Sequence, residues 1–161
     1  MKVMVLGGGG REHAVVHALS KSKITTELHC CPGTPGIAKL ALCHAGDPCD
    51  PKAMKELCTW LGIELVFVGP EAPLVAGTAD ALREAGILVV GPGASGARLE
   101  GSKAFSKTFM KKHGIPTSDF DLCTNLAECE AALKKRTAPF VVKADGLAAG
   151  KGAFLPETYE D

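Results

Sequence analysis

The sequence has no net charge and no long apolar run. Its 18 Lys and Arg residues balance 18 Asp and Glu residues, so no net field draws the chain to nucleic acid or to an anionic membrane. No apolar stretch of the 161 residues approaches the roughly 18 that a membrane-spanning helix needs. We therefore expect a small-molecule partner, with neither nucleic acid nor membrane.

The spacings typical of metal sites are missing as well. The seven cysteines form no C-x-x-C pair and are odd in number, and the "HAVVH" of His13 to His17 lacks the glutamate of a zinc-protease H-E-x-x-H. No signal peptide precedes the first expected strand. We therefore expect no metal site and no disulfide framework within these residues, but reduced cysteines that pack as small core residues of a cytoplasmic protein.

Short runs rich in Val, Ile, Leu and Cys alternate with helical patterns along the first hundred residues. The expected strands are 3–6, 27–31, 42–45, 65–68 and 88–90. Such alternation predicts an α/β fold, a Rossmann-like parallel sheet with helices on both faces. We assign this sheet to a first domain over 1–101.

Two helices between these strands have recognisable ends. Asp50 and Pro51 begin one of them, its apolar residues repeat at i, i+3, i+4 and i+7, and Gly62 ends it. Val75, Ala79 and Leu82 are expected to line a second helix that ends at Gly86.

The pattern changes at Ser102, where a second module over 102–161 is expected to begin. Ser102 can cap a linker helix in which Phe105 and Phe109 stack at i, i+4, and "GIP" from Gly114 to Pro116 ends it.

A further short helix and two short strands follow in this module. The helix is expected to be capped by Asn125 and buried along Leu126, Cys129 and Leu133, the strands lie at 140–142 and 153–155, and the tail 156–161 resembles the first turn of another helix. These elements cannot close a core of their own. We therefore expect the chain to be a fragment of a longer protein.

"LGGGGREH", Leu6 to His13, places four glycines between the first strand and the first helix. The N–H groups of such a turn, at the positive end of a helix dipole, form an anion site. The candidate contacts are Gly8, Gly9, Gly10, Arg11, Glu12 and His13. The Arg11 guanidinium suits a terminal phosphate monoester better than a bridging pyrophosphate, whereas His13 either donates to the same ligand or packs on the second strand.

A nicotinamide site is the weaker interpretation of this turn. A dinucleotide fingerprint G-x-G-x-x-G would need glycine where Glu12 stands, and no acidic residue ends the second strand.

Two more loops follow strand ends, where open α/β sheets bind ligands. "PGTPG", Pro32 to Gly36, offers Gly33 as a contact or serves as a rigid turn. "GPEAPL", Gly69 to Leu74, offers Pro70 and Glu71. Glu71 either accepts hydrogen bonds from sugar hydroxyls or stabilises the N-terminus of a helix.

Lysines and glycines mark a second candidate site. Lys143 ends an apolar strand, which predicts an anionic partner such as a phosphate. "GLAAGKG", Gly146 to Gly152, predicts a flexible hairpin over a polyphosphate; it is no Walker loop, because Gly152 replaces the hydroxyl residue and a strand follows. The candidate nucleotide contacts are Lys103, Lys143, Gly146, Gly150, Lys151 and Gly152.

Five motifs in this order, "GGGGREH", "PGTPG", "VGPEAPL", "GPGASGARLEGSKAF" and "KADGLAAGKG", resemble the amino-terminal part of the glycinamide ribonucleotide synthetase family, also called phosphoribosylamine–glycine ligases. The likeness covers all 161 residues. It departs at Thr34, where the family usually has Asn, and at Gly8, where the family commonly has Asn or Ser. The resemblance implies a pre-ATP-grasp domain followed by the start of an ATP-grasp domain.

The same resemblance implies an ATP-dependent ligase of de novo purine synthesis, in which glycine is activated as glycyl phosphate and attacked by 5-phosphoribosylamine. It implies that the glycine turn takes the 5'-phosphate, that Lys103 and Lys143 contact ATP, and that 146–152 form a lid. The ligands of Mg²⁺ and glycine are expected after Asp161, so the chain by itself is expected to be inactive. Fusion to further purine-synthesis domains stays open.

Two alternatives stay open beside this one. The first is another ATP-grasp enzyme with the same leading domain, such as a biotin carboxylase or a purine carboxylase subunit. The second is a nicotinamide-binding or regulatory Rossmann module.

Overall fold

The computed structural model describes residues 1–137, 139–148 and 150–158. The chain divides into two compact units, Met1–Arg98 and Leu99–Asp161. Each unit is described by itself.

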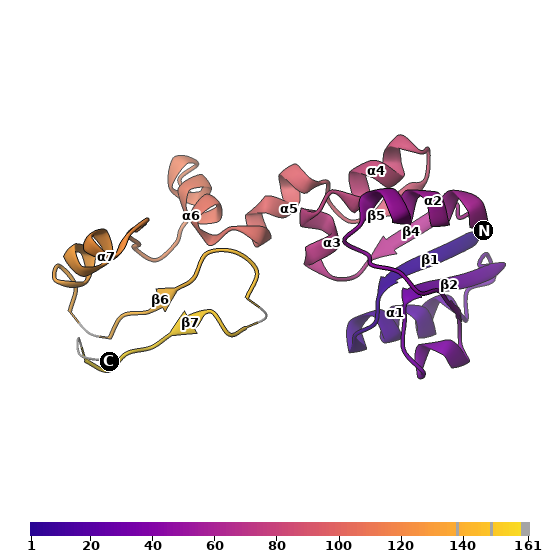
Figure 1. Cartoon of the computed structure of the whole chain (residues 1–161), viewed down its shortest axis with the longest axis horizontal. Coiled ribbons are helices and arrows are strands. Elements are labelled where there is room, and N and C mark those ends of the chain that lie inside the picture. The colour runs from indigo at the N-terminus through magenta and orange to yellow at the C-terminus, as the bar shows by residue number, and fades with distance from the viewer. Residues whose placement is uncertain (138, 149, 159–161) are drawn as a thin grey trace. The chain divides into compact units, whose positions relative to one another are not determined.

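The first unit is built on a parallel sheet of five strands in the order β3-β2-β1-β4-β5 (Figure 1). The strands are β1 (Lys2–Gly7), β2 (Glu27–Pro32), β3 (Leu42–Cys43), β4 (Leu65–Val68) and β5 (Leu88–Val90). All five predicted strands are confirmed, although β3 ends two residues earlier than expected. The strand order reverses beside the central β1, so the loops that follow β1, β2 and β4 leave neighbouring strand ends.

Helices cover both faces of this sheet, as the sequence predicted (Figure 1). The helical elements of the first unit are α1 (Gly10–Leu19), the 3₁₀ helix η1 (Ile37–Lys39), α2 (Pro51–Leu61), α3 (Glu71–Val75), α4 (Thr78–Glu84) and α5 (Ala94–Gly101), the last of which runs past the unit's end. Val16 of α1 packs with Val3 and Val5 on one face. Met54 of α2 packs with Met4 on the other.

The cysteines follow the core only in part. Cys30 and Cys31 are buried and belong to the clusters on opposite faces of the sheet, because neighbouring side chains alternate along a strand. Cys58 is also buried. The expectation that every cysteine packs in a core is wrong for Cys43 and Cys49, and also for Cys123 in the second unit, because all three lie on an edge strand or in loops and are exposed.

Helix α2 confirms both of its predicted ends. The Asp50 side chain accepts a hydrogen bond from the Ala53 N–H at 3.0 Å, and Gly62 adopts a left-handed conformation with φ of 69°. The second predicted helix is confirmed in part. Helix α4 carries the buried Ala79 and Leu82, and Gly86 with φ of 79° follows its end. Val75, however, belongs to α3, because Gly77 with φ of 89° separates the two helices.

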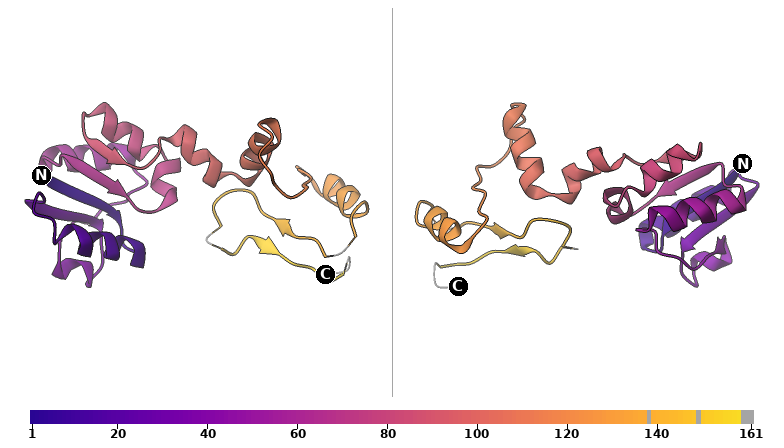
Figure 2. Two further views of the ribbon diagram at one scale, coloured as in Figure 1. Left: turned by 180° about the vertical axis from the view of Figure 1, so that it is seen from behind. Right: turned by 45° about the horizontal axis from the view of Figure 1, so that its top comes forward.

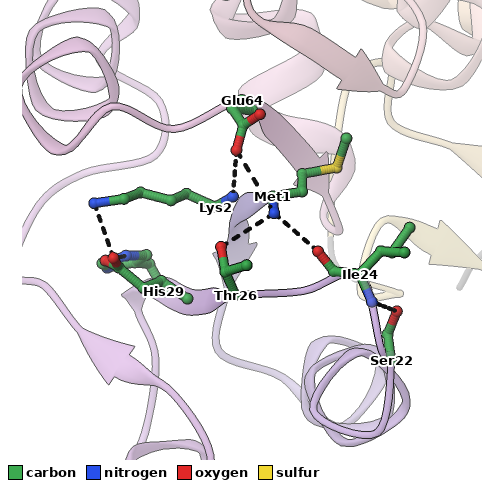
Figure 3. Close-up of polar contacts among 8 residues, drawn as sticks. Met1, Lys2, Ser22, Ile24, Thr26, His29 and Glu64 are labelled. Carbon is green, nitrogen blue, oxygen red and sulfur yellow. Dashed lines mark hydrogen bonds and ion pairs between the residues drawn. The ribbon is translucent and has the colours of Figure 1, made fainter.

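The start of β1 is held from two sides (Figure 3). The Met1 amino group donates to the Ile24 carbonyl oxygen at 2.8 Å and to the Thr26 hydroxyl at 3.0 Å. The Lys2 N–H donates to the Glu64 carboxylate at 2.7 Å. These contacts lie at the end of the sheet where β1 starts, opposite to the end that carries the candidate site.

The second unit contains α6 (Lys103–Lys112), α7 (Leu126–Leu133) and a two-stranded antiparallel sheet of β6 (Val142–Lys143) and β7 (Ala153–Phe154) (Figure 2). The predicted cap of α6 is confirmed, because Ser102 Oγ accepts from the Phe105 N–H at 3.1 Å. The rings of Phe105 and Phe109 are neighbours with centroids 6.2 Å apart, but they are tilted by 35° rather than stacked as predicted, because side chains one helical turn apart point outward at different angles.

Two predictions for this unit need correction. Asn125 caps α7 as expected, but no residue of this helix is buried and Leu126 is 74% exposed, because among the described residues no other helix or strand packs closely on it. The strand predicted at 140–142 is found at Val142–Lys143, where it pairs with β7. The helical turn expected at 156–161 falls partly on 159–161, which lie outside the described residues.

Candidate functional site

The loops after β1, β2 and β4 meet at one end of the sheet. A Cβ added to Gly8 would lie 2.9 Å from the Gly33 carbonyl oxygen, and one added to Gly7 would lie 2.9 Å from Pro70 Cδ. The glycine turn is therefore packed between the two other loops that the sequence marked. The structure brings together three motifs that are far apart in the chain.

The open part of the turn is the start of α1. The helix begins at Gly10, with Gly9 as its N-cap in an extended conformation. The N–H groups of Gly10, Arg11 and Glu12 have no acceptor one turn earlier in the helix. No atom lies within 4 Å of a Cβ added to Gly10, and the Arg11 side chain is exposed. This corner offers backbone donors, a helix dipole and a guanidinium to an anion.

Glu12 occupies a different place from the one expected of a ligand contact. It is only 5% exposed, and its Oε2 accepts a hydrogen bond from the Gly9 N–H at 2.6 Å. Its side chain lies against the glycines of the turn and against the loop after β4, since a Cβ added to Gly69 would lie 2.6 Å from Glu12 Cδ.

His13 and Gly33 belong to the contact between the first and second loops. His13 is half-buried, and a Cβ added to Gly36 would lie 3.0 Å from His13 Cε1. This favours the packing role of His13, against the turn that follows β2. Gly33 has a φ of 74°, and a Cβ there would overlap Cys43 Sγ, so only glycine fits at this position.

Pro70 and Glu71 begin the short helix α3. Pro70 is the N-cap and Glu71 lies in the first turn, half-buried. This position is compatible with both roles considered for Glu71, stabilisation of a helix N-terminus and contact with a sugar hydroxyl.

In the second unit, the β6–β7 hairpin is docked on the N-terminus of α6. Lys103 Nζ donates to the Gly146 carbonyl oxygen at 2.7 Å. Asp145 accepts from the Ala104 N–H at 3.1 Å and from the Ser102 hydroxyl at 3.0 Å. The Ala104 N–H, above all, holds the pKa of Asp145 below its usual value.

The sequence analysis missed Asp145. The signal was an acidic residue directly after the strand that carries Lys143, in a chain that also offers the unpaired N–H groups of a helix beginning at Lys103. An acidic side chain is favoured at such a helix start.

The other candidate nucleotide contacts lie on the hairpin itself. Lys143 and Lys151 are exposed. Gly146 and Gly150 have φ of 89° and 78°, and a Cβ on Gly152 would lie 2.6 Å from Ala148 Cβ. The structure thus links Lys103 to the hairpin through Gly146; residue 149 of the expected lid lies outside the described residues.

Among the residues that the structure describes, no group of three or more His, Cys, Asp or Glu side chains could hold a metal ion. No helix in the same residues is long and apolar enough to cross a membrane.

A Rossmann-like sheet with a glycine-rich turn after its first strand, followed by a helix and a glycine-containing hairpin, is typical of ATP-grasp proteins that carry a leading α/β domain. The family model "Phosphoribosylglycinamide synthetase, N domain" matches residues 1–100. The model "Phosphoribosylglycinamide synthetase, ATP-grasp (A) domain" matches residues 101–161. The chain belongs to the phosphoribosylglycinamide synthetase family.

Individual relatives agree with this family. The chain is 56% identical over 160 residues to a phosphoribosylamine–glycine ligase of Streptomyces coelicolor, and the match covers 99% of this chain but 38% of the relative. The crystal structure of a phosphoribosylamine–glycine ligase from Thermotoga maritima matches with a TM-score of 0.80 and 32% identity over 99% of this chain and 37% of that one. The chain therefore spans less than two fifths of the length of these relatives.

The fold is shared more widely. The biotin carboxylase domain of a 2-oxoglutarate carboxylase from Hydrogenobacter thermophilus matches with a TM-score of 0.78 over 99% of this chain and 38% of that one, at 21% identity. At this identity the likeness concerns the fold alone.

Proposed function

We propose that this chain supplies the phosphoribosylamine-binding domain and the beginning of the ATP-grasp domain of a phosphoribosylamine–glycine ligase, an ATP-dependent enzyme of de novo purine synthesis. The observation that carries the proposal is 56% identity to such a ligase over 99% of the chain. We place the domain boundary after residue 101; the two family models meet at 100 and 101.

In this proposal the 5'-phosphate of the substrate binds at the start of α1. The N–H groups of Gly10 and Arg11 donate to it, and the Arg11 guanidinium adds a charge-assisted pair. Gly33 and Pro70 form the walls of the turn, and Glu71 is placed to accept from a ribose hydroxyl. His13 supports the wall at Gly36.

ATP is proposed to bind in the second unit, at Lys103, Lys143 and the hairpin that carries Lys151. When bound, ATP would supply the phosphoryl group that activates glycine. The role of these lysines is to neutralise phosphate oxygens and to hold the reactants in line, which is most of what phosphoryl transfer requires of a protein. Because the chain spans 38% of its relative's length, we assign the Mg²⁺ and glycine ligands to the remaining part of the ligase. We also propose a cytoplasmic location for the whole enzyme.

The buried position of Glu12 supports a phosphate monoester against a dinucleotide. A dinucleotide fingerprint needs glycine at this position for close packing of helix on strand, whereas here a carboxylate lies beside Gly9 and Gly69.

The test is a titration of the chain with ribose 5-phosphate and inorganic phosphate, followed through the amide signals of Gly10 and Arg11. We expect Arg11→Ala to weaken binding by about 1.5–3 kcal/mol, the usual loss for a charge-assisted pair. Lys21→Ala, an equal change of charge at an exposed position just after α1, is the control and should leave binding unchanged. Saturable NAD binding with no response to either phosphate would refute the assignment.

The complete reaction separates the ligase from a carboxylase of the same fold. A protein that carries these residues together with the remaining length of the relatives should release ADP in the presence of glycine and phosphoribosylamine. ADP release that depends on bicarbonate instead would favour the carboxylase.

A further inference from the structure

The glycine-rich turn is filled from within by one side chain. A Cβ added to Gly7 would lie 2.7 Å from Glu12 Cγ, and one added to Gly9 would lie 2.8 Å from Glu12 Oε2. Gly69, on the loop after β4, faces the same side chain, with Glu12 Cδ at 2.6 Å from its added Cβ. The space left free by three glycines is therefore occupied by the Glu12 carboxyl group rather than open to a ligand.

This arrangement also consumes one of the turn's donors. The Gly9 N–H, at the N-cap of α1, donates to Glu12 Oε2 at 2.6 Å. The donors left for an anion are the N–H groups of Gly10 and the two residues after it, and the space beside Gly10 is open, with no neighbouring atom within 4 Å of an added Cβ. The carboxylate and a bound phosphate would thus lie at adjacent N–H groups of the same helix start.

Two consequences of opposite sign follow for an anion. By holding Gly9 against the loop after β4, Glu12 fixes the direction in which the next N–H groups point, which favours binding through preorganisation. Its negative charge, one residue position away from the anion, opposes binding through Coulomb repulsion. If Glu12 instead accepted a hydrogen bond from a sugar hydroxyl, its replacement would weaken the binding of ribose 5-phosphate and leave inorganic phosphate unaffected.

We propose that Glu12 is a positioning residue of the anion site and not a ligand contact: it shapes the glycine turn by occupying it, and its charge limits the affinity for phosphate monoesters. The inference rests on the proposed function, since it assumes that the start of α1 binds the substrate phosphate. It assigns to Glu12 a role different from the substrate contact expected in the sequence analysis.

The experiment compares Glu12→Gln, Glu12→Ala and the control Glu56→Gln in the 161-residue chain. Glutamine keeps the shape and an acceptor for the Gly9 N–H but removes the charge, so the dissociation constants of inorganic phosphate and ribose 5-phosphate should fall by about threefold to tenfold, less at high salt. Glu12→Ala removes the charge and also the side chain that fills the turn, so both ligands should bind more weakly to it than to Glu12→Gln. Glu56→Gln makes the same change of charge on the exposed face of α2 and should change neither.

A weaker binding of ribose 5-phosphate in Glu12→Gln, with inorganic phosphate unchanged, would overturn the proposal, because it would show that Glu12 accepts from a sugar hydroxyl. Hydrogen exchange of the Gly9 N–H in the chain without ligand tests the positioning role separately. Protection should persist in Glu12→Gln and disappear in Glu12→Ala, and protection that survives in Glu12→Ala would overturn the role. If the exchange pattern is as expected but no phosphate binds to any variant, the assigned anion site fails and the positioning of the turn stands.

Discussion

Gly69→Ala should be one of the most destabilising single-methyl changes in the first unit. The added Cβ would lie 2.6 Å from Glu12 Cδ. Gly7 and Gly9 lie against the same carboxyl group, so the carboxyl group has little room to shift within the turn. Glu12 is 5% exposed and hydrogen-bonded to Gly9, so it cannot swing into solvent without leaving that donor. Overpacking of a tight interior lowers the free energy of unfolding by about 1–3 kcal/mol. Because the Glu12 carboxyl group has little room to shift, we expect Gly69→Ala to lower it by about 2–3 kcal/mol.

The cause can be separated from a general loss of stability by a double-mutant cycle. Glu12→Ala alone should cost about 1–3 kcal/mol for its lost charge-assisted hydrogen bond. In that background the clash is gone, so Gly69→Ala should cost less than about 0.5 kcal/mol, which corresponds to a coupling of about 2 kcal/mol.

Urea unfolding followed by far-ultraviolet circular dichroism measures these free energies. Gly10→Ala is the matched control in the same turn, since nothing lies within 4 Å of its added Cβ, and it should be neutral or stabilising as a helix position. Equal costs for Gly69→Ala in the two backgrounds would refute the reasoning.

Three further predictions concern titrating groups. Burial raises the pKa of the Cys30 and Cys58 thiols to about 12, so both should resist alkylation in the native chain at mildly alkaline pH and react only on unfolding, as mass spectrometry of labelled peptides would show. Because the pKa of Asp145 is lowered by its bonds at the start of α6, its contribution to hairpin docking is present above its ordinary pKa and lost as the pH falls below it; Asp145→Asn should remove this dependence, measured by amide exchange in α6. His29, 2% exposed and 2.9 Å from His44 (Figure 3 shows His29), has its pKa lowered from 6.5 by burial and by the charge of His44, against the pull of Glu27. The unfolded chain therefore takes up this proton first, so the urea midpoint should fall as the pH drops below 6.5, and His29→Gln should flatten that fall.

Local signals in the sequence were sufficient where the neighbours in the chain decide the structure. Asp50 and Gly62 define α2 because a side-chain acceptor at one end and a left-handed glycine at the other are local devices. The strand positions followed from short apolar runs, which are almost wholly buried in the central strands β1 and β2. The order β3-β2-β1-β4-β5 is a result of the structure; the alternation of strands and helices predicted a parallel sheet but no order.

Contacts between distant residues explain what the sequence could not predict. Val75 and Ala79 were predicted in one helix but are separated at Gly77, and next to this break the Thr78 hydroxyl donates to the Pro48 carbonyl oxygen at 2.7 Å. No local pattern contains this contact. The same holds for the packing of Glu12 against Gly69 and for the hydrogen bonds of Asp145 at the start of α6, more than 40 residues away in the chain.

The two departures from the family pattern noted in the sequence, Gly8 and Thr34, prove to be neighbours. A Cβ on Gly8 would lie 2.9 Å from the Gly33 carbonyl oxygen and 3.5 Å from Thr34 Cγ2. An Asn or Ser side chain at position 8, which the resemblance implies for many relatives, would need the space that the second loop occupies here. Positions 8 and 34 therefore lie at the same contact between the first and second loops. Since Gly10 and Arg11 lie outside this contact, we expect both departures to affect the wall of the proposed anion site and to leave its donors in place.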